Sequence, residues 1–265
     1  MRFGLLILPE GRWSEVGERW RAAEQLGFDH AWTYDHLTWR SFREKPWFSA
    51  LPTLTAAAMT TTRIRLGTLV ASPNFRHPVP FAKELMSLDD LSDGRLTLGF
   101  GAGAESFDAT ALGQEPWSRR ERSERFQEFV ELLDDLLRST RTNRRGRYYA
   151  ADEARSIPGC IQRPRIPFAL AATGARGLQL AATHGQAWVL VDARGDPADL
   201  TQRLDAACET IDRDPRSLQR MALIGFEGDP FASVDAFRDF AGRYQALGFT
   251  DLVAHWPREE APFEG

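Results

Sequence analysis

The chain has 265 residues, of which 43% are hydrophobic and 26% charged, and its formal net charge is −4 at pH 7. This composition is that of a globular protein with ample material for a core, and its acidic balance argues against nucleic acid as a main partner. The length suits two small domains or one α/β barrel.

The sequence carries no evident export or membrane signal. Residues 1–13 lack the basic start and long apolar core of a signal peptide, and no apolar run is long enough to span a bilayer. Cys160 and Cys208 form neither a metal-binding spacing nor a disulfide framework. We therefore expect a reduced, cytoplasmic protein that does not bind membranes.

Strand-like and helix-like segments alternate from the first residues onward. The first part of the chain predicts a strand at 3–8, a helix at 14–26 capped by Ser14 and closed by Gly27, a strand at 30–34, a long loop at 35–47 and a helix at 51–60.

The block 63–107 reads as strand, helix and strand, and each strand stops at an unusual loop. The first strand, 64–71, runs into Ser72-Pro73-Asn74-Phe75-Arg76-His77-Pro78. The helix covers 80–91, and the second strand, 95–100, runs into Gly101-Ala102-Gly103. Parallel βαβ units place the loops after their strands on one side, where ligands bind.

The second half continues the alternation. It predicts helices at 118–137, 174–183, 197–211 and 233–247, strands at 168–171, 187–191, 221–226 and 250–254, and an irregular excursion at 140–167. Eight strands with crossovers predict one (β/α)8 TIM barrel over residues 1–265, with a doubly wound open sheet as the alternative. Because only residues 255–265 follow the last strand, we expect the eighth helix to be short or missing.

His36 is the best single candidate for catalysis, because it follows the second strand and titrates near neutral pH. Asp35 beside it points to the other side if the strand continues. The alternative is a histidine that only fixes the following loop by hydrogen bonds. His30 and His184 belong to the opposite rim, where we expect structural roles.

Two loops suit a bound ring or anion. Gly101-Ala102-Gly103 lets the backbone approach a flat ligand, although a tight turn is the alternative. It is not a dinucleotide fingerprint, because the third glycine is missing. Thr173-Gly174-Ala175-Arg176 opens a helix, where free N–H groups and an arginine suit a phosphate, although an N-cap with a solvated arginine is equally consistent.

Aromatic side chains near strand ends suit the walls of an apolar pocket, and core packing explains some of them equally well. The candidates that follow strands are Trp39, Trp47, Phe75, Phe107 and Trp256. No metal-binding pattern and no Gly-x-Ser-x-Gly elbow is present.

Several phrases together resemble the bacterial luciferase-like superfamily of flavin- and deazaflavin-dependent oxidoreductases. They are Leu26-Gly27-Phe28-Asp29 before Asp35-His36-Leu37, Arg65-Leu66-Gly67-Thr68 before Arg76-His77-Pro78, Leu88-Asp89-Asp90-Leu91-Ser92-Asp93-Gly94-Arg95, Leu98-Gly99-Phe100-Gly101-Ala102-Gly103 and Ala171-Ala172-Thr173-Gly174. The resemblance covers nearly the whole chain and implies a (β/α)8 barrel.

The resemblance also implies FMN or coenzyme F420 at the carboxyl ends of the strands, and a small organic substrate. His36 then matches a histidine that moves a proton beside the ring. The cofactor-binding candidates are Asp35, a bulge that often contains a non-proline cis peptide (Leu69, Val70, Ala71 and Ser72), the glycine turn (Gly101, Ala102 and Gly103) and the phosphate loop (Thr173, Gly174, Ala175 and Arg176). The substrate-binding candidates are Trp39, Trp47, Phe75, Glu105, Phe107 and Trp256.

The chain departs from the family pattern at two places. Gln186 stands where many relatives have an aspartate, and Ala104 stands where some deazaflavin dehydrogenases have a glutamate, with Glu105 displaced by one. The activity implied is a luciferase-like monooxygenase or an F420-dependent dehydrogenase or reductase. The alternatives are a barrel glycosidase that uses Glu105 and Glu227 and a non-catalytic flavin-binding barrel. A homodimer is a further hypothesis.

Overall fold

A computed structural model of the chain describes residues 1–39, 42–104, 107–227 and 230–257. Within these residues, eight parallel strands close into a barrel in the order β1-β10-β9-β8-β7-β4-β3-β2. The strands are β1 (Arg2–Leu6), β2 (His30–Thr33), β3 (Arg65–Ala71), β4 (Leu96–Gly101), β7 (Phe168–Ala171), β8 (Ala187–Val191), β9 (Gln219–Ile224) and β10 (Asp251–His255). The predicted (β/α)8 barrel is therefore confirmed, and the open-sheet alternative was wrong.

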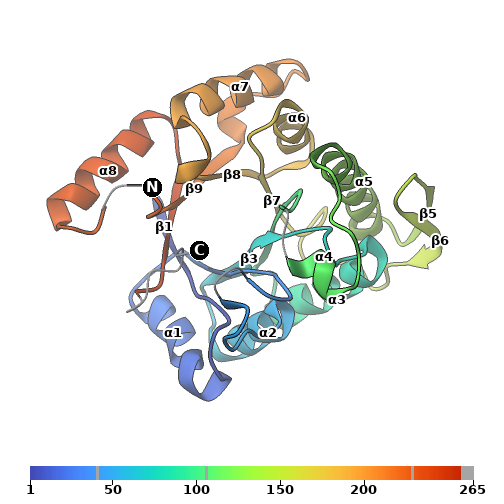
Figure 1. Ribbon diagram of the computed structural model, residues 1–265, viewed down its shortest axis with the longest axis horizontal. Coiled ribbons are helices and arrows are strands. Elements are labelled where there is room, and N and C mark those ends of the chain that lie inside the picture. The colour runs from blue at the N-terminus through green and yellow to red at the C-terminus, as the bar shows by residue number, and fades with distance from the viewer. Residues whose placement is uncertain (40–41, 105–106, 228–229, 258–265) are drawn as a thin grey trace.

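Most of the helices surround the strands as an outer layer (Figure 1). They are α1 (Trp13–Gln25), α2 (Ala50–Thr60), α3 (Pro78–Leu91), α4 (Phe107–Ala111), α5 (Arg119–Arg138), α6 (Ala175–His184), α7 (Pro197–Glu209) and α8 (Val234–Ala246). After β10 the described chain reaches only Pro257, so the prediction of a short or missing eighth helix falls mainly outside the described residues. No helix of the described ranges is long and apolar enough to cross a membrane.

Alternation along the strands divides the core into two clusters, because successive side chains of a strand point to opposite faces. Leu5 and Ile7 belong to the outer cluster, together with helix residues such as Trp20 and Phe126. The inner cluster fills the barrel and takes the intervening residues, among them Leu6, Leu8, Trp32, Tyr34, Leu69, Val189 and Val253. The barrel is thus packed below its mouth, which leaves the loops at the carboxyl ends of the strands to form a site.

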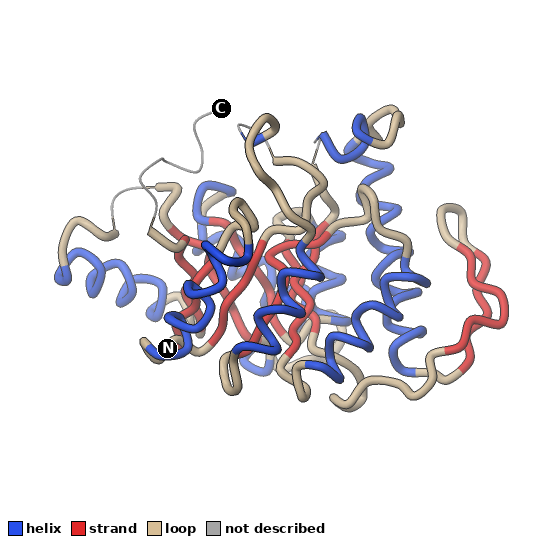
Figure 2. The backbone as a smooth tube through the Cα atoms, turned by 90° about the horizontal axis from the view of Figure 1, so that it is seen from below, coloured by secondary structure: helices blue, strands red, loops and turns tan. Residues whose placement is uncertain are grey.

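The stretch 140–167, predicted to be irregular, instead contains an antiparallel hairpin of β5 (Arg141–Arg145) and β6 (Ala150–Arg155). It projects from the barrel beside α5 (Figures 1 and 2). Salt bridges between arginines and carboxylates, such as that between Arg144 and Asp135, join it to α5. Because charged side chains occupy both faces, the hairpin shows no hydrophobic alternation in its sequence.

Two local predictions need correction. Ser14 lies inside α1, and the N-cap of this helix is Arg12, which exchanges hydrogen bonds with Glu15. The five-residue helix α4 was not predicted, because a single turn carries no helical period. By contrast, Ser118 caps α5 through a capping box with Glu121, as the start of the predicted helix requires.

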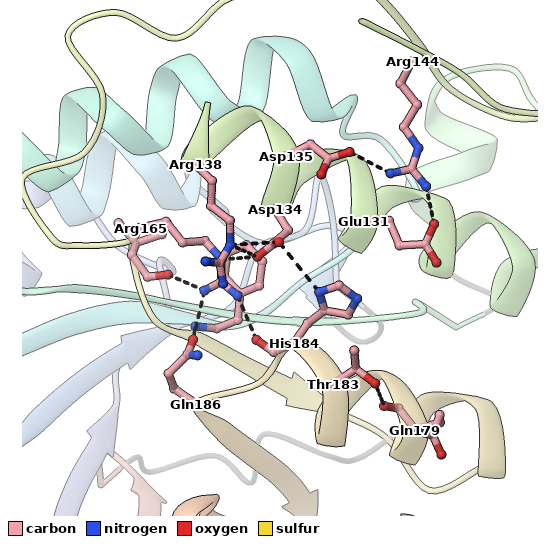
Figure 3. Close-up of polar contacts among 12 residues, drawn as sticks. Glu131, Asp134, Asp135, Arg138, Arg144, Arg165, Gln179, Thr183, His184 and Gln186 are labelled. Carbon is pink, nitrogen blue, oxygen red and sulfur yellow. Dashed lines mark hydrogen bonds and ion pairs between the residues drawn. The ribbon is translucent and has the colours of Figure 1, made fainter. Parts of the chain in front are cut away.

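Figure 3 shows a buried polar network at the amino ends of the strands. The Arg165 guanidinium donates to Asp134, to the Gln186 side chain at 2.9 Å and to the His184 carbonyl oxygen at 2.8 Å. Its carbon also lies 3.4 Å from the centroid of the Phe168 ring. Gln186 and His184 therefore help to hold a structural arginine on the rim opposite the candidate site.

Candidate active site

The three residues that follow β2 have different environments. Tyr34 belongs to the inner cluster, and His36 lies two residues further, near the mouth. Asp35, between them, is buried and accepts two hydrogen bonds from the Arg76 guanidinium, at 2.7 and 3.0 Å. Because Arg76 follows β3, this ion pair joins the loops after two neighbouring strands. A contact of Asp35 with a cofactor stays a prediction.

His36 is fixed by contacts from several segments. Its Nδ1 lies 2.7 Å from a carboxylate oxygen of Asp108, which is completely buried on α4. The other oxygen of Asp108 accepts a hydrogen bond of 2.8 Å from the Leu37 amide. The Trp39 ring packs against the imidazole with centroids 4.3 Å apart, and the Trp47 indole donates to the His36 carbonyl oxygen. The histidine is thus held by its ring and by its backbone.

A second polar pair lies near His36. Tyr34 Oη is 2.9 Å from Nε2 of His255, and the ring centroids of Tyr34 and His36 are 6.3 Å apart. Burial lowers the pKa of His255 to about 4, so that its imidazole is neutral at pH 7. Phe226, after β9, places its ring 5.4 Å from the His255 ring. Aromatic and imidazole rings from three strand ends therefore form one wall of the mouth.

The end of β3 is irregular, as the family resemblance implies. Its pairing with β4 shifts register between Thr68 and Ala71, and the Leu69–Val70 peptide bond is cis. Leu69 lies in the inner cluster and Val70 packs against it, while Ser72 is buried at the start of the following loop. This segment presents apolar side chains and backbone toward the top of the barrel.

The glycine turn after β4 lies against the same bulge. A Cβ at Gly101 would lie 3.5 Å from Cγ2 of Val70 and 3.3 Å from the Ala171 carbonyl oxygen. Gly103 has a φ of 74°, and a Cβ there would come within 2.5 Å of Oδ1 of Asn74. Asn74 in turn donates to the Ala104 carbonyl oxygen at 3.2 Å. The turn thus requires glycine and keeps the backbone open where a flat ring needs close approach.

The first turn of α6 fits a phosphate. Gly174 is its N-cap, and Gly174, Ala175 and Arg176 are exposed. The first N–H groups of a helix have no partner within the helix and carry the positive end of its dipole. A Cβ at Gly174 would meet nothing within 4 Å, so this backbone is sterically accessible. Thr173 lies half-buried before it, and its carbonyl oxygen accepts from Arg203.

The substrate-binding candidates have different environments. Trp39 and Trp47 contact His36, as described above, and Phe107 begins α4 with the Arg43 guanidinium 4.6 Å from its ring centroid. Arg76 covers the Phe75 ring at 4.8 Å. Glu105 lies outside the described residues.

Trp256 directly follows β10. It packs against the outer cluster, whereas its neighbour His255 contacts Tyr34. A substrate contact for Trp256 stays a prediction.

Sequence reasoning placed Asp108 and His255 among the residues that follow strands but assigned neither of them a role, and it did not name Tyr34 as a candidate. Asp108 and His255 follow β4 and end β10, so their positions at strand ends were visible signals. Their partners lie 72 and 221 residues away in the sequence, and no local pattern predicts such pairs. Among the described residues, no group of three potential ligands could hold a metal ion.

The fold and the site together define a class: a (β/α)8 barrel with a carboxylate-bound histidine, a β-bulge and a glycine turn at one mouth, and an open helix N-terminus nearby. Residues 1–226 match the model of the luciferase-like monooxygenase family. The chain belongs to this family. The glycosidase alternative is thereby left without support; Glu227 is exposed and its amide donates to Asp192.

Two relatives with named activities are similar to this chain over most of its length. An F420-dependent glucose-6-phosphate dehydrogenase of Beutenbergia cavernae is 34% identical over 82% of this chain and 66% of its own length. An F420-dependent hydroxymycolic acid dehydrogenase of Mycobacterium tuberculosis is 32% identical over 82% of this chain and 60% of its own length. The chain thus spans about 60–66% of the length of these two relatives.

Solved structures agree on the fold. The F420-dependent tetrahydromethanopterin reductase of Methanopyrus kandleri superposes with a TM-score of 0.78 at 18% identity, covering 97% of this chain and 93% of the other. The monooxygenase RslO1 of Streptomyces bottropensis superposes with a TM-score of 0.71 at 27% identity. This match covers 93% of this chain and 82% of the other.

Proposed function

We propose that this chain is the catalytic barrel of an F420-dependent oxidoreductase that interconverts a hydroxyl and a carbonyl group on a small organic substrate. The observation that carries the proposal is His36, held at the mouth beside the β3 bulge in a chain 34% identical to an F420-dependent dehydrogenase. The names of both curated relatives given above support F420 as the cofactor.

The residues at the mouth fit such a cofactor. Leu69 and Val70 would lie behind the ring, Gly101 and Gly103 would allow its edge to approach the backbone, and the first turn of α6 would hold its phosphate. F420 supplies a carbon that accepts or donates a hydride. The protein would contribute orientation and an apolar surface formed by Leu69, Val70 and their neighbours in the inner cluster.

His36 would handle the proton that accompanies the hydride. In the oxidation of an alcohol, F420 would accept the hydride from the carbinol carbon, and Nε2 of His36 would accept the hydroxyl proton. In the reverse direction the imidazolium returns that proton to the carbonyl oxygen. Histidine is the side chain that most often acts as a general acid or base, since an imidazole nitrogen can both accept and donate a proton.

A flavin-dependent monooxygenase is the second candidate. The description of the matching family and the 27% identity to the monooxygenase RslO1 favour it. The two candidates differ in the cofactor that is bound and in whether oxygen is consumed, so the same experiment separates them.

The experiment compares the wild-type protein with His36→Asn and with His184→Asn, a histidine on the opposite rim. F420 and FMN are each added together with a panel of secondary alcohols, sugar phosphates and ketones, and cofactor reduction, reoxidation and oxygen uptake are recorded. We expect F420 turnover without oxygen uptake. H36N should lower turnover about 100-fold or more while F420 stays bound.

H184N should retain wild-type turnover. Equal turnover in H36N and the wild type would remove His36 from the mechanism. Turnover with FMN and oxygen alone would favour the second candidate, and a wild-type protein that binds F420 but turns over no donor would support the non-catalytic alternative.

A homodimer also remains part of the proposal. Phe231 and Val234 are exposed apolar side chains just before and at the start of α8. Figure 1 shows α8 on the side of the barrel near α1. Light scattering at low concentration tests the assembly, and a clean monomer would refute it. A cytoplasmic location and a single domain over 1–265 likewise stay predictions.

A further inference from the structure

We propose that Asp108 is a positioning residue that sets the tautomer of His36, so that Nε2 is the nitrogen that exchanges a proton with the substrate. This inference rests on the proposed function, and it concerns a residue to which sequence reasoning assigned no role. Asp108 acts through His36 and does not itself carry the proton.

With Asp108 ionised and His36 neutral, the contact between them allows one assignment of hydrogens. An ionised carboxylate is only an acceptor. The 2.7 Å contact with Asp108 therefore requires the hydrogen of the neutral imidazole to be on Nδ1. Nε2 then carries the lone pair. The other oxygen of Asp108 is bound to the Leu37 amide at 2.8 Å, which prevents the carboxylate from rotating away.

Burial strengthens this arrangement. The Asp108 side chain is fully buried and that of His36 is 11% exposed, so water competes little for the contact. Trp39 lies against the ring with planes inclined by 35°, which restricts rotation of the imidazole about its χ2 angle. The other end of the ring, Nε2, is the end that Asp108 does not contact.

The chemical consequence is a carboxylate–histidine pair of the kind that serves general acid–base catalysis elsewhere. The carboxylate keeps the base in the correct tautomer and stabilises the imidazolium that forms when Nε2 accepts a proton. The same pair couples the reaction to α4, because Asp108 lies on that short helix. Any displacement of α4 would release the imidazole.

The test is a long-range ¹H–¹⁵N NMR spectrum of ¹⁵N-histidine-labelled protein without cofactor, with His36 assigned from H36N. We expect the Nδ1–H tautomer in the wild type. Asp108→Asn offers an amide of the same shape, whose NH₂ group would donate to Nδ1 while its oxygen keeps the Leu37 contact. D108N should therefore shift His36 to the Nε2–H tautomer.

Turnover with F420 provides the second measurement. D108N should lose about 100-fold or more in kcat, with F420 affinity unchanged within about threefold. Because the two residues act as one unit, the double variant D108N/H36N should be no slower than H36N. Thr110→Ala is the control, since it removes an exposed hydrogen bond on α4 without touching His36.

T110A should keep both the wild-type tautomer and the wild-type turnover. An Nε2–H tautomer in the wild type would overturn the proposal. This measurement is made on the wild type alone and does not depend on the folding of any variant. An unchanged tautomer in D108N, or a loss of activity that adds fully to that of H36N, would also overturn it. A wild-type protein that binds no F420 would instead refute the proposed function, and the tautomers alone would then decide the role of Asp108.

Discussion

Tyr34 and His255 meet near the mouth of the barrel, with Oη 2.9 Å from Nε2, although 221 residues separate them in the sequence. β1 lies between the two strands that carry them. The pair therefore joins strand ends that are not hydrogen-bonded to each other, and it does so next to His36.

The neutral state of His255 makes stability depend on pH. Its pKa is about 4 in the folded protein, below the ordinary value of 6.5, so the unfolded chain binds more protons between these values. The stability that the neutral His255 contributes is fully present above pH 6.5 and is lost as the pH falls toward 4. Between pH 7 and 4.5 the free energy of unfolding of the wild type should fall by roughly 1–3 kcal/mol more than that of His255→Gln, as measured by urea unfolding. Equal losses would show that His255 is accessible to protons when folded.

Gly103 should be more sensitive to substitution than Gly113, although both have a positive φ. An alanine at either position carries a backbone cost of about 1 kcal/mol. Only Gly103→Ala also forces Asn74 aside, because nothing lies within 4 Å of a Cβ at Gly113. F420 titration should show about tenfold weaker binding for G103A and unchanged binding for G113A. Identical affinities would separate the glycine turn from the cofactor site.

The network of Figure 3 predicts a stability effect without a functional one. Arg165 is buried and shares Asp134 with the more exposed Arg138. Arg165→Met should lower the free energy of unfolding by about 3 kcal/mol, because it removes the charged partner of Asp134 and a hydrogen-bond donor to the carbonyl oxygens of Ile166 and His184. Arg138→Met should cost less than about 1 kcal/mol. Denaturant unfolding measures both, and equal effects would contradict the assigned role of Arg165.

The sequence predicted the barrel well where the hydrophobic periodicity of a segment and the turn residues at its ends indicate the same element. The block 63–107 became β3, α3 and β4 with the loops at the expected ends. The hairpin β5–β6 was missed because its arginines hide the strand period and its partners are the carboxylates of α5. Local pattern carries no information about such long-range ion pairs.

The candidate site was predictable to about the same extent as the fold. Strand ends identified His36, the glycine turn and the first turn of α6, because topology alone places them at one rim. The partners of His36 and Tyr34 were not identified, because a hydrogen bond between distant residues depends on barrel closure and on the position of α4. Trp256 also lies at a strand end but packs against the outer cluster, and its contact with a substrate stays a prediction.

We propose that the mouth holds a phosphate-bearing redox ring against His36 and the first turn of α6. A fluorescence titration with F420 tests it on three proteins: the wild type, Gly174→Ser and Gly174→Asp. Both side chains fit at this open N-cap position and suit it, but only aspartate adds a negative charge where the phosphate is expected. We predict one F420 bound per chain, similar affinity for G174S and about tenfold weaker binding for G174D. Equal affinities for G174S and G174D, or no binding of either F420 or FMN to the wild type, would contradict the account.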